Sequence, residues 1–292
     1  MSSIAAPASG PLPAHGARFK RPPTRTAYRW ELRKLVSQKR TYLGLGLAVA
    51  LPLIFVLVQV LHHHHDRGEN IFESQITHSG LATPVLMLLF LSVFMLPLIA
   101  SLVAGDVVAA EDGNGTLKTI LTRSIDRGQV FAAKALAALT YAAIAVFLSA
   151  TVATAAGVAA WGFNSVTTYS GTVVSASEGL LLVFAANGCY LIPLFAVVSL
   201  GVLLSTVTRN STAAVVGAVG ITILLFIIAQ IPGIEGIRPY LLTEQYEAWH
   251  GLLRTPTDWA PIWHSLWVCA LYAGPALAAA FLVFLRRDVA GG

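Results

Sequence analysis

The sequence predicts an all-α polytopic membrane protein with six transmembrane helices, and three observations lead to this fold class. Hydrophobic residues make up 56% of the 292-residue chain and charged residues only 11%, whereas soluble domains carry about 25% charged residues. Backbone groups in lipid must be paired within their own segment, so long apolar spans are expected to be helices. Six windows contain no Asp, Glu, Lys or Arg: 43–65, 74–105, 135–177, 179–208, 210–234 and 259–285.

The order of elements follows from composition along the chain. Residues 1–26 are rich in Pro, Ala, Ser and Gly, which predicts a disordered cytoplasmic arm. Over 28–40, apolar residues recur at helical spacing between basic ones, which is typical of an amphipathic helix lying on a membrane surface. We expect residues 27–292 to form one six-helix transmembrane domain.

Each charge-free window holds the roughly 20 apolar residues needed to cross about 30 Å of hydrocarbon. A polar turn of only four residues, 208–211, separates the fourth span from the fifth, so these two spans are predicted to be antiparallel neighbours. The expected spans cover about residues 43–61, 84–104, 135–160, 180–206, 213–231 and 263–285.

The basic residues predict the orientation. The segment before residue 43, the stretch 105–134, Arg209, Arg286 and Arg287 together hold 16 of the 19 Lys and Arg residues. Cytoplasmic connections carry the excess of basic residues, so both termini are expected in the cytoplasm. The connections expected outside are 62–83, 161–178 and 232–262.

The segment 105–134 is the most informative of the cytoplasmic connections. It is too polar to insert into a membrane and too short to fold alone. Acidic residues precede a glycine break, after which Leu117 and Leu121 share an apolar face. This pattern predicts a short amphipathic helix over 107–119 that binds a partner; the alternative is a solvated loop that merely joins two spans.

This segment resembles the corresponding part of the ABC type-2 exporter permeases, whose second span runs into an acidic, glycine-containing cytoplasmic helix. The layout of the six spans, the amphipathic helix before them and the basic residues after them extend the resemblance over most of the chain from about residue 27. Ser124 and Ile125 depart from the pattern, since many relatives have proline and valine there. The residues that carry the motif are Glu111, Gly115, Thr116, Leu117, Leu121, Arg127 and Lys134.

The resemblance implies the transmembrane permease subunit of an ATP-driven ABC exporter in a prokaryotic cell (cytoplasmic) membrane. Such a subunit forms a homodimer or a heterodimer with a related permease and binds a separate ATPase (nucleotide-binding) subunit. Residues with implied partner-coupling roles are Glu111, Gly115, Thr116, Leu117, Leu121 and Arg127.

We expect this chain not to be an enzyme and to hold no catalytic residue or cofactor. It has no GxxxxGK[ST] loop to cradle phosphates, so ATP and Mg are expected in the partner subunit. No nucleic-acid partner is expected, because the basic residues sit beside membrane ends, where anionic lipids attract them.

Three amide side chains within the spans, Gln59, Asn187 and Gln230, could line a substrate path, or they could tie helices together by hydrogen bonds. The span centres carry no ionisable residue. We therefore expect an apolar or amphipathic substrate such as a lipid, a peptide or a drug-like molecule.

Two other functions are kept as alternatives: a non-transport membrane subunit that senses a ligand or transmits force, and a metal-binding intramembrane enzyme. His62 and His65 lie at i, i+3 spacing just beyond the first span, and imidazole is a common metal ligand. Histidines in a short polar loop more often meet water and headgroups, and the spans lack paired carboxylates with histidine, so we expect no metal site.

The connection 232–262 interleaves aromatic and apolar residues with charged ones. This composition predicts short interfacial or re-entrant helices. They could form an outer gate, or their aromatic side chains could anchor the protein at the level of the lipid headgroups.

Overall fold

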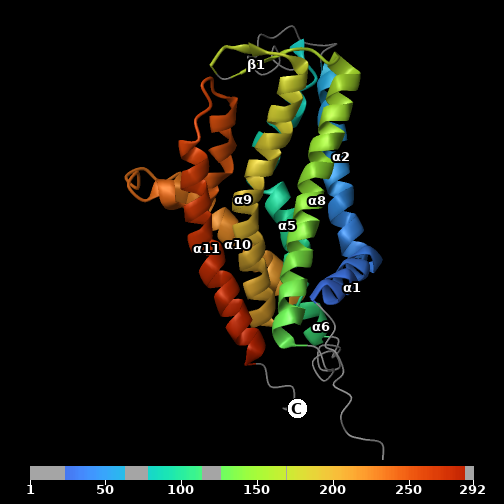
Figure 1. The fold of residues 1–292 in the computed structure, drawn as a ribbon, viewed down its shortest axis with the longest axis vertical. Coiled ribbons are helices and arrows are strands. Elements are labelled where there is room, and N and C mark those ends of the chain that lie inside the picture. The colour runs from blue at the N-terminus through green and yellow to red at the C-terminus, as the bar shows by residue number, and fades with distance from the viewer. Residues whose placement is uncertain (1–23, 63–77, 114–125, 169, 287–292) are drawn as a thin grey trace, which may run out of the picture.

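The computed structural model describes residues 24–62, 78–113, 126–168 and 170–286, and it confirms an all-α polytopic membrane protein (Figure 1). Five of the described helices are long and apolar enough to cross a membrane. A bent helix pair supplies a sixth crossing if it is counted as one span. The five long helices are α2 (Lys39–His62), α8 (Arg127–Trp161), α9 (Ala176–Thr208), α10 (Ser211–Ala229) and α11 (Ala260–Leu285).

The bent pair is where the structure differs from the prediction of one continuous second span. A short break separates helix α4 (Ala82–Leu91) from helix α5 (Met95–Ala104). The segment Met95–Gly113, which begins with α5, is inclined by 64° to α4. Pro97 lies in the first turn of α5. Since proline has no N–H and its ring crowds the carbonyl four residues earlier, Pro97 favours a bend at this point.

A tyrosine from another span stabilises the break. The Tyr190 hydroxyl of α9 donates a hydrogen bond of 2.7 Å to the backbone carbonyl of Ser92, which lies between α4 and α5. Tyr190 is only 1% exposed, and its ring lies 5.8 Å from that of Tyr246. The carbonyl is therefore satisfied by a side chain where no water is at hand.

Replacing Tyr190 with Phe is expected to lower the free energy of unfolding by about 1–3 kcal/mol, because a buried carbonyl loses its donor. Thermal unfolding of the purified protein in detergent measures the change. Tyr42→Phe is the matched control, since the Tyr42 side chain is 58% exposed at the start of α2. Equal losses in the two variants would contradict the role given to Tyr190.

Helix α1 (Thr24–Ser37) confirms the expected amphipathic helix, and α2 begins two residues after its end. One face of α1 packs against α8: Leu35 is buried, and the Tyr28 hydroxyl lies 2.7 Å from Thr140 Oγ1. Trp30 on the opposite face is 65% exposed. The helix is thus joined to the bundle by one face and leaves the other for the membrane surface.

Local caps explain where the long helices begin. Asp126 accepts a hydrogen bond from the Gly128 N–H and starts α8, eight residues before the predicted span. Ser175 and Glu178 form a capping box at the start of α9. Asn210 caps α10 after Arg209 takes a left-handed conformation with φ 55°. This tight turn makes α9 and α10 packed antiparallel neighbours, as predicted.

A small β-hairpin that the sequence did not predict lies at one end of the bundle (Figure 1). Its strands are β1 (Val166–Thr167) and β2 (Val173–Val174), paired antiparallel. Ser170 Oγ accepts a hydrogen bond of 2.9 Å from the Thr255 N–H, which joins the hairpin to the loop before α11. We call this end of the molecule the hairpin end and the opposite end, which holds α1 and helix α6 (Ala109–Gly113), the α1 end.

The expected short helices between α10 and α11 are present as two 3-10 helices, η1 (Arg238–Tyr240) and η2 (Leu242–Leu253). Helix η2 packs against α9, α10 and α11, and Leu242, Tyr246 and Trp249 are at most 1% exposed. A role in an aromatic belt is therefore wrong for Tyr246 and Trp249. The exposed aromatic residues that fit such a belt are Tyr240, Trp259, Trp263 and Trp267.

Candidate functional site

Four charged side chains from three helices meet at the α1 end of the bundle. They are Glu31 and Lys34 of α1, Glu111 of α6 and Lys134 of α8, and we call them the four-charge cluster. Lys134 Nζ lies 2.9 Å from Glu31 Oε1 and 2.6 Å from Glu111 Oε2, and Lys34 Nζ also pairs with the Glu111 carboxylate. Two acids and two lysines balance one another, so the cluster is neutral overall.

The burial of this cluster is unusual for charged groups. The side chain of Lys134 is 0% exposed and that of Glu111 is 3% exposed. Removing a charge from water costs several kcal/mol, which is offset only when partners and hydrogen bonds are well placed. The arrangement therefore requires α1, α6 and α8 to stay together, because separating any one of them would leave a buried charge without its partner.

Local sequence explains why α1 can supply two members of the cluster. Glu31 and Lys34 are three residues apart, so they lie on the same side of the helix. The Tyr28 contact with Thr140 and the buried Leu35 hold that side against α8. The opposite side carries the exposed Trp30, with the Arg33 guanidinium 5.8 Å from its ring centroid.

The segment before α6 is bound to three further helices. The Asp106 carboxylate accepts hydrogen bonds from Arg40 of α2 and from the Ser211 hydroxyl of α10. The Ser205 hydroxyl of α9 accepts the N–H groups of Val108 and Ala109 at 3.1 and 3.0 Å. These contacts fix the polypeptide that leads out of the broken span α4–α5.

Two of the predicted partner-coupling residues bind other helices of the same chain in the structure. Glu111, which we expected to face a partner, is buried and bound by Lys34 and Lys134. Arg127 begins α8 and donates a hydrogen bond of 3.0 Å to the Leu285 carbonyl at the end of α11. The other four predicted residues lie outside the described residues: Gly115, Thr116, Leu117 and Leu121.

The three amides predicted to line a path lie on separate helices. Gln59 is half-buried on α2, and Gln230 is exposed at the end of α10. Asn187 is 3% exposed on α9, and its Nδ2 donates to the Val183 carbonyl of its own helix at 2.9 Å. The Asn187 side chain is thus hydrogen-bonded within its own helix.

Two members of the four-charge cluster, Glu31 and Lys34, were not predicted. Glu31 is the first acidic residue of the chain and the only one before Asp66, in a segment that is otherwise basic. Lys134 stands where an apolar helix begins. A single acid among bases, together with a single base at the start of an apolar helix, is the signal that could have indicated their pairing.

A second polar region lies beside the start of α11, where η1, η2 and the first turns of α11 line a pocket of about 610 Å³. Most of its charges pair with one another: Arg238 with Glu244 at 2.9 Å and Arg254 with Asp258 at 3.5 Å. Burial, with a contribution from Glu244, raises the pKa of Glu247, and burial followed by the nearby Arg254 lowers the pKa of His250.

Within the described ranges, no three His, Cys, Asp or Glu side chains are grouped so that they could hold a metal ion. His62 is the last residue of α2. Its side chain and the whole of His65 lie outside what the structure describes. The expectation that these two histidines form no metal site therefore stays a prediction.

Comparison with known proteins gives a family match. The family model with the description "Protein of unknown function (DUF2705)" matches residues 51–290, well over half of the chain. The matched range begins within α2 and extends past the end of α11, so α1 with Glu31 and Lys34 lies before it. No curated protein matches the chain.

Proposed function

The chain belongs to the DUF2705 family, and we propose that it is the permease subunit of an ATP-driven ABC exporter. In this proposal the protein works as a dimer in a prokaryotic cytoplasmic membrane, with both termini and the α1 end on the cytoplasmic side. Separate ATPase subunits bind below it and supply the energy. Its substrate is apolar or amphipathic.

The observation that supports this proposal most is the four-charge cluster. The polypeptide between α6 and α8 belongs to the segment 105–134, which resembles the segment through which type-2 permeases contact their ATPases. The described residues on both sides of that segment are tied by Glu111 and Lys134 to each other and to α1. A force applied to residues 114–125 would thus reach the broken span, α8 and α1 together.

The proposal gives separate roles to the residues of this segment. Glu111 is a positioning residue that holds α6 against α1 and α8. Leu117 and Leu121 supply the apolar face that fills a groove of the ATPase. Alternating access needs two discrete arrangements with different affinities for nucleotide and substrate, and the 64° break between α4 and α5 is where the second span would change its angle.

The experiment is affinity purification of the tagged chain from its own cells in mild detergent, followed by identification of co-purified proteins and reconstitution into vesicles. We expect a polypeptide with a phosphate-binding loop to co-purify, and its ATP hydrolysis to depend on this chain. Leu117→Ala together with Leu121→Ala is expected to reduce the recovery of the ATPase about tenfold or more, the change given by a loss of about 1.4 kcal/mol at the interface.

Lys39→Ala is the matched control, because Lys39 is an exposed basic residue at the α1 end outside the four-charge cluster. It is expected to leave recovery and ATP hydrolysis unchanged. If complexes isolated from cells contain this chain and never a nucleotide hydrolase, the exporter proposal is wrong. A membrane subunit that senses or transmits force would then be the function to test.

A further inference from the structure

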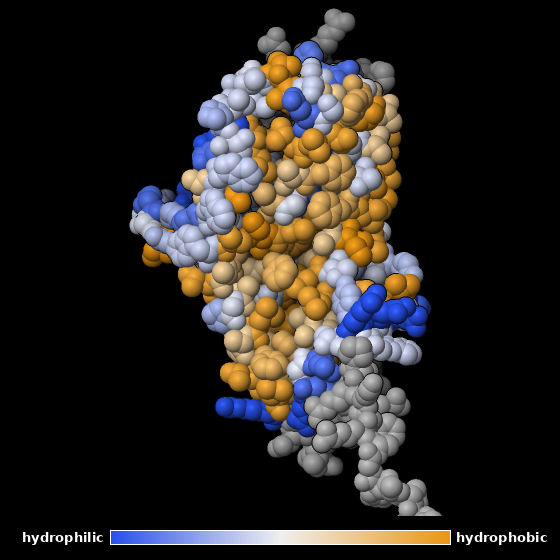
Figure 2. Space-filling model, viewed as in Figure 1, coloured by the Kyte–Doolittle hydropathy of each residue, from blue (hydrophilic) through white to orange (hydrophobic). Residues whose placement is uncertain are grey.

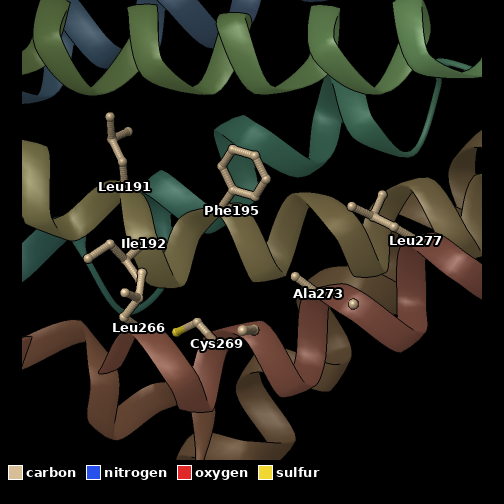
Figure 3. Close-up of a pocket in the computed structure, with 9 residues that line it drawn as sticks. Leu191, Ile192, Phe195, Leu266, Cys269, Ala273 and Leu277 are labelled. Carbon is tan, nitrogen blue, oxygen red and sulfur yellow. The ribbon is translucent and has the colours of Figure 1, made fainter. Parts of the chain in front are cut away.

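An apolar groove runs between α9 and α11, with a volume of about 530 Å³ (Figure 3). We call it the α9–α11 groove. Its walls include Leu191, Ile192 and Phe195 of α9 and Leu266, Ala273 and Leu277 of α11. In the close-up, Ile192 and Leu266 point toward one another at one end, and Ala273 faces α9 with only a methyl group. The volume lies within the roughly 300–1,000 Å³ of small-molecule sites.

Small residues on α11 make the groove hollow. Ala270, Ala273 and Gly274 occupy successive positions along the side of α11 that faces it. A methyl group added at Gly274 would point into open space. Had these positions carried leucines, like Leu266 and Leu277 at the two ends, their side chains would have filled the space between the helices.

Most of the groove lies at the depth expected for the membrane hydrocarbon. At 1.5 Å per residue, the stretch of α11 from Leu266 to Leu277 is about 16 Å long. It begins about 9 Å after the start of α11 and stops about 12 Å before its end. Both α9 and α11 are candidate spans, so the medium along the open side of the groove is lipid. The surface there is largely apolar (Figure 2).

The shape and chemistry of the groove restrict what can fill it. A vacant hollow would forfeit the dispersion contacts of its walls, and water needs two to four polar partners, which a wall of aliphatic and aromatic groups does not offer. A transmembrane helix is about 10–12 Å wide and does not fit between α9 and α11, because these two helices pack directly against each other. A single hydrocarbon chain fills the hollow, needs no polar partner and is narrow enough to lie in the groove.

We propose that the α9–α11 groove binds one acyl chain of a membrane lipid. Trp263, 65% exposed, lies on the same side of α11 one turn before Leu266, and Trp259, 56% exposed, lies one turn further out. Exposed Trp rings favour the level of the lipid headgroups. The chain therefore enters from the hairpin end, with its headgroup beside these rings.

Lipid tails are as apolar as leucine, so moving a tail from the bilayer into the groove gains no hydrophobic free energy. Packing contacts with the groove walls therefore hold the bound chain. The bound chain should exchange with the bilayer but spend more time in the groove than at the rest of the protein surface. This inference goes beyond the exporter proposal, and its test needs no ATPase partner, so either can fail without the other.

The test uses the full chain reconstituted into vesicles of phosphatidylethanolamine and phosphatidylglycerol. These contain a small fraction of phosphatidylethanolamine with a diazirine in the middle of one acyl chain. After irradiation, mass spectrometry of peptides locates the cross-links. We expect them to concentrate at 191–195 and at the groove-lining residues of α11, above the level at Leu271. Leu271 lies on the same helix but outside the groove and is 62% exposed.

Gly274→Phe and Ala270→Phe place a ring inside the groove, and each is expected to lower cross-linking at 191–195 about tenfold, which corresponds to about 1.4 kcal/mol. Ala278→Phe is the matched control, because Ala278 is exposed on the same helix and does not line the groove. It should leave the labelling unchanged.

Two outcomes would overturn the proposal. Labelling at the groove no stronger than at Leu271 and equal in all four proteins would show annular lipid only. Cross-links that join two copies of the chain through the groove would show that protein covers it. Thermal unfolding of each variant in detergent verifies that the Phe side chains have not simply prevented folding, and Ala270→Phe provides a second variant if Gly274→Phe fails to fold.

Discussion

Replacing Lys134 with Met is expected to lower the free energy of unfolding by about 3–5 kcal/mol, the cost of removing one partner from a buried ion pair. The Lys134 side chain is 0% exposed and contacts both Glu31 and Glu111. Met has a similar length and leaves no cavity of consequence, so the loss measures the two carboxylates left without their shared cation. Thermal or denaturant unfolding in detergent gives the value.

A double variant separates charge from packing. In Lys134→Met with Glu111→Gln, one negative charge is removed along with the positive one, and Lys34 stays beside Glu31 on α1. We expect the double variant to be more stable than Lys134→Met alone, with a coupling free energy of about 2 kcal/mol. Lys39→Ala, an exposed control at the same end, should change stability by less than about 0.5 kcal/mol. Glu111→Gln alone completes the cycle, and if its effect and that of Lys134→Met simply add in the double variant, the four-charge cluster does not act as a unit.

The sequence predicted the number and order of the crossings because this information is local. A window of about 20 apolar residues is sufficient to specify a membrane helix, and five such windows coincide with single helices in the structure. The break in the second span could not be placed in the same way. Three prolines lie inside unbroken helices: Pro52, Pro193 and Pro275. The presence of a proline therefore does not by itself predict a break such as the one near Pro97.

Contacts between distant parts of the chain explain the rest of what was missed. Tyr190 and Ser92 are 98 residues apart, and Lys134 and Glu31 are 103 residues apart. The charge pattern of 28–40 fits a surface helix with water on its polar side equally well. The single acid Glu31 among basic residues indicates a pairing, but only the packing of α1 on α8 identifies the buried Lys134 as its partner.

For the aromatic residues between α10 and α11, the sequence likewise did not predict which side chains are buried. Tyr and Trp are enriched both in membrane-interface belts and in buried packing, so composition could not separate the two. The structure divides them: Tyr246 and Trp249 of η2 are buried, whereas Trp259 and Trp263 are exposed. The 3-10 helix η2 is thus held by packing against three spans.

Replacing Trp249 with Ala is therefore expected to lower the free energy of unfolding by about 3–5 kcal/mol, the usual loss for a large aromatic side chain removed from a core. Trp249 is 1% exposed, and its ring centroid lies 4.1 Å from that of His250. The cavity left behind would lie between η2 and the helices that it packs against, α9, α10 and α11. Unfolding in detergent measures the loss, and limited proteolysis of 232–258 reports whether η2 detaches first.

Trp263→Ala is the matched control, since it removes the same side chain from a position that is 65% exposed. Its ring is covered by lipid or detergent before and after unfolding, so the expected change is within about 0.5 kcal/mol. Faster proteolysis of 232–258 in Trp249→Ala alone would show that η2 is held by its buried ring. Equal sensitivity in both variants would mean that the buried ring of Trp249 does not hold this segment, and the account of η2 as an element held by packing would be wrong.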